Sequence, residues 1–399
     1  MSTISKATQL LYASDQLPDI DISSESMPIF TTTAFTWNSI SEAIEGYAKT
    51  KTGDGYSYIR TNNPNRTALA TAITQLEGGE ASLICASGMG AITSTLLTFL
   101  QSGDHIIYSN CCYGETLDVM KQLFTKFGVE TTAVNIENMD EVTAALRPNT
   151  KIIYTEVVAN PLMKVADVPA LAKLIHKNDG LLIIDNTFTT PFAIQPLSLG
   201  ADIVIHSLTK FLNGHSDALA GSVTAKKELI DQINPVSMFC GTPADPYSTW
   251  LVFRSLRTAF LRVPRQMQHA AILAKALARD PRVQAVYHPS IESFSGHETA
   301  KKLFANDASM CGMVSFVVSE DFAQRDEFSR RLQLVHYAPT LGGVRTTYQQ
   351  PVYSSHAHLS DEERRKAGIT PGLIRVSVGI EPIEDILADF KQALDAFDR

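Results

Sequence analysis

Three short segments contain residues whose types and spacing could do chemistry. The first, residues 202–210 (DIVIHSLTK), is an apolar strand that ends in Ser207, Thr209 and Lys210. Open α/β sheets place their sites at the carboxyl ends of strands, and a lysine desolvated there becomes a usable nucleophile and base. The two hydroxyls beside it suit a phosphate. A solvated lysine remains the competing interpretation of this segment alone.

The second segment, residues 181–187 (LLIIDNT), ends a very apolar strand with Asp185. A carboxylate is costly to bury without a partner, and a protonated pyridine nitrogen would be such a partner. A cofactor ring that acts as an electron sink needs an acid at that place. An aspartate that only caps the following turn explains the residue equally well.

The third segment, residues 86–92 (ASGMGAI), opens a helix with small residues directly after a strand. The free backbone N–H groups of Gly88 and Met89 would then form an anion site. A dinucleotide fingerprint requires a third glycine at position 93, where the chain has Thr93. The segment therefore favours a phosphate monoester over a pyrophosphate, and it disfavours a dehydrogenase.

Together the segments supply a phosphate cup, a partner for a ring nitrogen and a lysine for an imine. They predict an enzyme that holds pyridoxal 5′-phosphate (PLP) as a Schiff base on Lys210. The cofactor-binding residues from these segments are Gly88, Met89, Asp185, Ser207, Thr209 and Lys210.

The elements that must position these residues alternate between strand and helix from about residue 68. This pattern predicts an α/β fold with a mostly parallel sheet covered by helices. A long helical stretch over 246–279 leads into a smaller C-terminal α/β domain. The predicted units are an irregular N-terminal arm (1–60), a large cofactor-binding domain (61–255) and a small domain (256–399). The predicted strands are 82–86, 105–109, 130–135, 151–157, 181–185 and 201–206.

Composition narrows the class of protein further. The 399 residues are 44% hydrophobic and carry a net charge of -8, which argues against nucleic acid or an anionic membrane as a partner. No apolar run approaches the about 18–20 residues that span a bilayer. Five cysteines without a CxxC motif favour a cytoplasmic protein. His356 and His358 lack further ligands at suitable spacing, so we expect no metal site.

The chain resembles the Cys/Met-metabolism family of fold-type I PLP-dependent enzymes nearly from end to end. The most specific match is HSLTKFLNGHSD (206–217). Supporting stretches are YSYIRTNNP (56–64), LEGGEASLICASGMGAI (76–92), EVVANPLMKVADV (156–168), IIDNTFTTPF (183–192), TLGGV (340–344) and IRVSVGIE (374–381).

The resemblance implies further roles. Tyr113 would stack on the cofactor ring and move protons at the leaving group, and Asn160 would hydrogen-bond the cofactor's phenolic oxygen. Arg375 would clamp the substrate α-carboxylate. Tyr58 and Arg60 would reach the cofactor phosphate of a neighbouring subunit, so the family's usual homotetramer, a dimer of active dimers, is expected.

The implied activity is γ-elimination from a sulfur-containing or related γ-substituted amino acid, which gives a 2-oxo acid and ammonia. The alternatives are γ-replacement on O-acyl-homoserine, β-elimination, a γ-lyase reaction on a non-standard amino acid, and a non-catalytic binder that kept the fold. Glu115, Arg345 and Thr340 depart from family patterns and are expected at the distal end of the substrate. Glu115 and Arg345 would form either a selective charged pair or a solvated rim pair.

Overall fold

The computed structural model describes residues 24–398 apart from residues 54, 355–356 and 358–359, so His356 and His358 lie outside the described residues. Six of the seven strands of the larger sheet run in the same direction, and β9 runs antiparallel to both of its neighbours. Its order is β1 (Ala81–Cys85), β9 (Gly221–Ala225), β8 (Ile203–Ser207), β7 (Leu181–Asp185), β4 (Thr150–Glu156), β2 (His105–Ser109) and β3 (Glu130–Val134). This confirms the predicted fold class, a mostly parallel sheet in an α/β fold.

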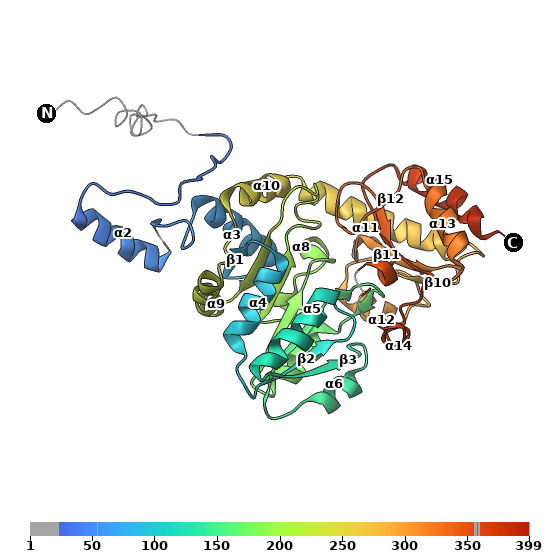
Figure 1. Cartoon of the computed structure of the whole chain (residues 1–399), viewed down its shortest axis with the longest axis horizontal. Coiled ribbons are helices and arrows are strands. Elements are labelled where there is room, and N and C mark those ends of the chain that lie inside the picture. The colour runs from blue at the N-terminus through green and yellow to red at the C-terminus, as the bar shows by residue number, and fades with distance from the viewer. Residues whose placement is uncertain (1–23, 54, 355–356, 358–359, 399) are drawn as a thin grey trace.

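The central strands are apolar throughout because both of their faces are buried. Successive side chains point to opposite faces of a strand. Ile106, Ile152 and Ile183 accordingly belong to one core cluster, whereas Ile107 and Ile153 belong to the other. Helices cover both faces (Figure 1). They include α3 (Pro64–Glu77), α4 (Gly88–Phe99), α6 (Met139–Ala145), α7 (Val168–His176) and α9 (Lys227–Cys240).

Two predicted helices are interrupted. The stretch 116–127 forms α5 (Gly114–Asp118), a π-helical turn (Val119–Leu123) and a 3₁₀ turn (Phe124–Phe127). The stretch 246–279 forms two helices, α10 (Pro246–Leu256) and α11 (Ala259–Leu277). Arg262 donates to the carbonyl of Ser255 at 3.1 Å, which adds a side-chain donor to a carbonyl at the end of α10.

The smaller sheet lies in the C-terminal part of the chain, beside the larger one (Figure 1). Its order is β10 (Ala285–Tyr287), β11 (Met313–Val317), β14 (Leu373–Ser377), β13 (Thr347–Gln349) and β12 (His336–Tyr337). Phe316, Phe328 and Phe390 form its aromatic core with edge-to-face and tilted ring contacts. The helices of this region are α11, α12 (His297–Leu303), α13 (Phe322–Arg331), α14 (Asp361–Lys366) and α15 (Ile383–Leu394).

The sequence predicts an irregular N-terminal arm, but the structure places helix α2 (Ile40–Thr52) within it. The Ser39 side chain caps the first turn, and Gly53 ends the helix with a φ of 88°. The described part of the arm, which includes α2, extends away from the body of the chain (Figure 1). Ile40 and Ile44 on α2 are strongly exposed. Within the described part of the chain, no helix is both long and apolar enough to cross a bilayer.

Candidate active site

Three neighbouring parallel strands of the larger sheet end in polar residues at one edge. Glu156 ends β4, Asp185 ends β7 and Ser207 ends β8. Glu156 and Asp185 are direct partners in the register of their strands. Lys210 follows Ser207 in a tight turn, where its backbone N–H donates to the Ser207 carbonyl at 3.2 Å. The carboxyl edge of the sheet therefore collects the residues that the sequence placed at strand ends.

The Lys210 amine lies in a desolvated and positively biased setting. Burial lowers the pKa of Lys210, the Arg375 guanidinium lowers it further, and the Glu115 carboxylate opposes the shift. A lower pKa increases the fraction of neutral amine, which is the form that attacks a carbonyl and accepts a proton. The setting of Lys210 suits both an imine-forming nucleophile and a general base.

Asp185 is a partly buried carboxylate with few compensating donors. Its Oδ1 accepts from the Thr187 N–H at 2.9 Å, and its Oδ2 accepts from the Tyr154 hydroxyl at 3.4 Å. Burial raises the pKa of Asp185, while the hydrogen bonds from Thr187 and the nearby His206 act in the opposite direction. A cation bound against Asp185 would stabilise its charged form.

The start of α4 approaches the end of β8 very closely. Ser87 caps α4 by accepting from the Gly90 N–H at 3.0 Å. A Cβ added to Gly88 would lie 2.9 Å from Ser207 Cβ, so only glycine allows this approach. The Thr209 hydroxyl donates to the Ala220 carbonyl at 3.2 Å and accepts from its N–H at 3.1 Å. The first turn of α4, which includes Met89, and Ser207 thus form a cradle suited to a phosphate.

Tyr113 lies directly before α5, on the loop that follows β2. It is partly exposed, with 38% of its surface accessible. Burial and the Glu115 carboxylate raise the pKa of Tyr113 to about 12, against a smaller opposing effect of Arg375. The phenol is therefore protonated at neutral pH and is able to donate a proton.

Arg375 is a buried guanidinium on β14 with no carboxylate within ion-pair distance among the described residues. Its Nη1 donates to Asn160 Oδ1 at 2.9 Å and its Nη2 donates to the Thr340 carbonyl at 3.4 Å. With its amide oxygen turned toward Arg375, Gln349 accepts from both terminal nitrogens at 2.9 and 2.6 Å. Burial lowers the pKa of Arg375 to about 10. A buried guanidinium with only neutral partners suits recognition of a carboxylate.

The remaining predicted site residues lie outside this cluster or at its rim. Glu115 and Arg345 are both exposed, and no ion pair joins them. Tyr58 and Arg60 lie on the exposed arm, where the Arg60 guanidinium stands 5.8 Å from the Tyr58 ring centre. Arg60 also donates to the Met238 carbonyl at 3.5 Å. Their roles toward substrate and cofactor stay predictions.

Sequence reasoning missed one carboxylate of this edge and a buried pair behind it. Glu156 Oε1 accepts from the Tyr113 N–H at 2.6 Å, and Oε2 accepts from the Asn160 N–H at 2.9 Å. Deeper in the domain, His206 Nε2 contacts the Glu77 carboxylate, and both side chains are buried. The signal for Glu156 was the one used for Asp185, an acid at the end of an apolar strand.

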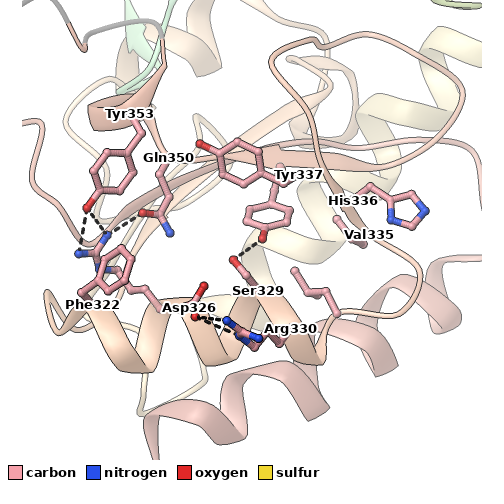
Figure 2. A pocket seen from close by; sticks show the side chains of 12 residues that line it. Phe322, Asp326, Ser329, Arg330, Val335, His336, Tyr337, Gln350 and Tyr353 are labelled. Carbon is pink, nitrogen blue, oxygen red and sulfur yellow. Dashed lines mark hydrogen bonds and ion pairs between the residues drawn. The ribbon is translucent and has the colours of Figure 1, made fainter.

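A second concave feature lies on the smaller domain, between α13 and strands β12 and β13 (Figure 2). This pocket of about 430 Å³ is lined by aromatic and polar side chains, and none of the predicted site residues is among them. Its buried Arg325 already donates to Gln350 Oε1 at 2.6 Å and to the Glu320 carbonyl at 3.2 Å. Arg375 is the better carboxylate site, because its guanidinium is close enough to Lys210 to lower the pKa of that amine, whereas this pocket contains no lysine.

The residues of the carboxyl edge fit PLP. Lys210 could form an imine with the aldehyde of PLP, and Asp185 could pair with its ring nitrogen. The cradle of Gly88 and Ser207 could bind its phosphate monoester. A mostly parallel α/β sheet with this set at its carboxyl edge and a smaller C-terminal sheet defines a fold-type I PLP-dependent enzyme.

Comparison with known proteins places the chain within one family. Residues 7–395 match the model of the Cys/Met metabolism PLP-dependent enzyme family, and the chain belongs to this family. PLP is therefore its cofactor, and the chain is a PLP-dependent lyase.

Two proteins of similar sequence and one solved structure illustrate what the chain resembles. The L-methionine gamma-lyase of Fusobacterium nucleatum subsp. polymorphum is 40% identical over 93% of each chain. The cystathionine gamma-lyase of Bacillus subtilis is 43% identical over 88% of this chain and 92% of its own. A crystal structure of cystathionine gamma-lyase from Lactobacillus plantarum, complexed with L-serine, aligns with a TM-score of 0.86 at 33% identity, over 93% of each chain.

Proposed function

We propose that the enzyme catalyses γ-elimination on a sulfur-containing or related γ-substituted amino acid. With water, this reaction gives a thiol, a 2-oxo acid and ammonia. The observation that carries the proposal is the buried Arg375 guanidinium, held by neutral partners close to the desolvated Lys210 amine. A carboxylate bound there would place the adjacent amino group and Cα of an amino acid within the cluster. The similarity to the two γ-lyases supports the choice of reaction.

Each group of the site then has a role in the reaction. Arg375 binds the α-carboxylate through two parallel hydrogen bonds, and Asn160 fixes the orientation of the guanidinium. The Lys210 amine removes the α-proton, because its lowered pKa leaves it neutral more often than an ordinary lysine. The Tyr113 hydroxyl, protonated at neutral pH, delivers a proton to the departing sulfur.

Asp185 and the cradle serve the cofactor. When bound, PLP supplies an electron sink for charge that develops on the substrate carbons. The Asp185 carboxylate holds the proton on the ring nitrogen, while Gly88, Met89, Ser207 and Thr209 hold the phosphate. Because the Thr209 hydroxyl is bonded to the Ala220 backbone, its contribution to phosphate binding comes through the fixed position of this turn.

The proposed assembly is a homotetramer of two active dimers in the cytoplasm. An arm that extends from the body, with exposed Tyr58 and Arg60, supports a site completed by a second copy of the chain. The exposed apolar residues of α2, Ile40 and Ile44, give that copy a surface to cover. Four of the five cysteines are buried and all five are free thiols, which supports a reducing compartment.

The test is a product assay on the PLP-loaded enzyme. L-methionine, L-cystathionine and O-acetyl-L-homoserine are incubated with and without an added thiol, and 2-oxo acid, ammonia and thioether are measured. We expect 2-oxobutanoate and ammonia in equal amounts without thiol. Formation of a thioether as the main product would establish γ-replacement instead, and pyruvate from cystathionine would establish β-elimination. Absence of turnover with bound PLP would favour a non-catalytic binder.

A further inference from the structure

Glu156 is the buried carboxylate that connects the two sides of the candidate active site. It ends β4, and each of its oxygens accepts one backbone N–H, from Tyr113 at 2.6 Å and from Asn160 at 2.9 Å. These two N–H groups belong to different loops, one after β2 and one between the short strands β5 (Val158–Ala159) and β6 (Lys164–Val165). A single side chain therefore fixes the backbone of both loops.

We infer that Glu156 is a positioning residue, which holds Tyr113 over the reacting centre and Asn160 against Arg375. The inference rests on the proposed function, for which it supplies the support behind the acid and the carboxylate clamp. Glu156 itself touches neither substrate nor cofactor in this assignment.

The connection to Arg375 runs through one residue. Glu156 fixes the Asn160 backbone, and the Asn160 Oδ1 accepts from Arg375 Nη1 at 2.9 Å. Asn160 is almost fully buried, so its side chain has little freedom once its backbone is held. A displacement at residue 156 would therefore reach the guanidinium that binds the α-carboxylate. The same displacement would also move Tyr113, whose N–H donates to the Oε1 oxygen of Glu156.

A carboxylate meets this requirement better than any neutral side chain. The side chain, ionised above its raised pKa of about 8, offers two acceptor oxygens and no donor, which matches two converging N–H groups. A glutamine would offer one oxygen, and its NH₂ group would face the second N–H. The position is otherwise unfavourable for an acid, because Glu156 is 6% exposed and lies beside the Asp185 carboxylate.

The experiment compares Glu156→Gln with wild type in the PLP-loaded enzyme by two readouts. Glycine has an α-carboxylate but no γ-substituent, so its dissociation constant, followed by cofactor absorbance, reports on the Arg375 side. Turnover of the best substrate gives kcat and KM. We expect PLP to bind within a few-fold of wild type, glycine to bind about 10-fold more weakly, and kcat/KM to fall about 100-fold.

The matched control is Asp202→Asn, at the opposite edge of the same sheet. Asp202 Oδ2 also accepts a backbone N–H of a neighbouring strand, from Leu182 at 2.7 Å. This control is expected to retain wild-type glycine affinity and kcat/KM. Glycine affinity within 2-fold of wild type in Glu156→Gln would overturn the inference, as would an equal loss in the Asp202 variant.

A double-mutant cycle separates positioning from a general loss of structure. If Glu156 acts through Asn160, the combination with Asn160→Ala weakens glycine binding far less than the product of the single effects. Independent effects that multiply would contradict the inference. Should Glu156→Gln not fold, Glu156→Asp tests the same point, because its shorter side chain cannot reach both loops. Wild-type glycine affinity in that variant would also contradict it.

Failure of the proposed function would look different. Glycine binding to the PLP enzyme requires no particular leaving group or γ-substituent. If the product assay identified replacement or β-elimination, the glycine measurement and the double-mutant cycle would still decide the role of Glu156. A wild-type enzyme that bound glycine without turning over any substrate would contradict the proposed function alone.

Discussion

The two edges of the large sheet differ in how they hold charge: at the amino-terminal edge Arg147 and Glu130 pair near solvent, whereas at the carboxyl edge Glu156 is buried and has no ion-pair partner among the described residues. Arg147 and Glu130 form an ion pair with side chains 47% and 49% exposed. Glu156, by contrast, is 6% exposed and stands beside a second carboxylate, Asp185. The sheet thus carries a stabilising ion pair at one edge and an energetically costly pair of carboxylates at the other.

The contrast between the two edges indicates that the fold tolerates a loss of stability at the carboxyl edge, where the candidate active site lies. Burial raises the pKa of Glu156 to about 8, with Asp185 adding to the shift. At the other edge, the buried His105 ring hydrogen-bonds the hydroxyls of Thr150 and Thr132, both at 2.8 Å, and carries no uncompensated charge. Unfavourable electrostatics confined to one edge of a sheet is typical of a functional site.

The largest expected effect follows removal of Lys210 at the carboxyl edge of the large sheet. Lys210→Ala removes both the imine-forming amine and the base, so turnover should fall by at least about 10⁴-fold. The measurement is 2-oxo acid release together with borohydride trapping of the cofactor on the chain. Asp202→Asn serves as the control at the other edge and should keep wild-type turnover. Persistent turnover in Lys210→Ala would refute the assignment.

The second effect concerns the carboxylate clamp. Arg375→Ala removes charge-assisted hydrogen bonds to the α-carboxylate, and we expect kcat/KM to fall about 10²–10³-fold, with most of the change in KM. Arg325→Ala is the comparison, because that second buried arginine lines the separate pocket of Figure 2. It should destabilise the fold but leave KM near wild type. Equal KM effects in the two variants would remove the distinction between the two arginines.

Whether a site residue or an element could be predicted from the sequence depends on whether its signal is local or comes from tertiary contacts. Lys210 and Asp185 could be found because an ionisable residue at the end of an apolar strand contradicts the strand's burial. Glu156 met the same criterion but was overlooked, because its partners are backbone groups of loops that no pattern brings together. Helix α2 was missed although its sequence carries a helix signal, because Ile40, Ile44 and Tyr47 repeat at helical spacing after the Ser39 cap. The break between α10 and α11 depends on tertiary hydrogen bonds of Arg262.

The third effect is a pH dependence of the apoenzyme's stability. The folded-state pKa of Glu156, about 8, lies above the ordinary value of 4.5. The folded state therefore binds a proton that the unfolded state releases between these values, and stability falls as pH rises through that window. The slope is at most about 1.4 kcal/mol per pH unit. Urea unfolding from pH 5 to 8 should show a smaller loss for Glu156→Gln than for wild type.

The smallest effect belongs to the paired edge. Arg147→Ala removes an exposed ion pair, and the free energy of unfolding should fall by about 0.2–1 kcal/mol, with kcat and KM unchanged. Denaturant unfolding at low and high salt measures it, since screening should erase most of the difference. A change in KM would show that the two edges are coupled and would weaken the contrast between them.

Gly342 shows how closely the two domains depend on one another. Its φ is 78°, and a Cβ added there would lie 2.7 Å from the carbonyl carbon of Lys210. The Val344 N–H in the same loop donates to the Gly214 carbonyl at 2.8 Å. The small domain therefore contacts the lysine turn through main chain at Gly342 and Val344, and the Arg262 side chain adds hydrogen bonds to the carbonyls of Phe211 and Leu212. A tilt of the small domain would therefore move the Lys210 amine, so a rigid contact between this loop and the lysine turn keeps the amine in place for the reaction.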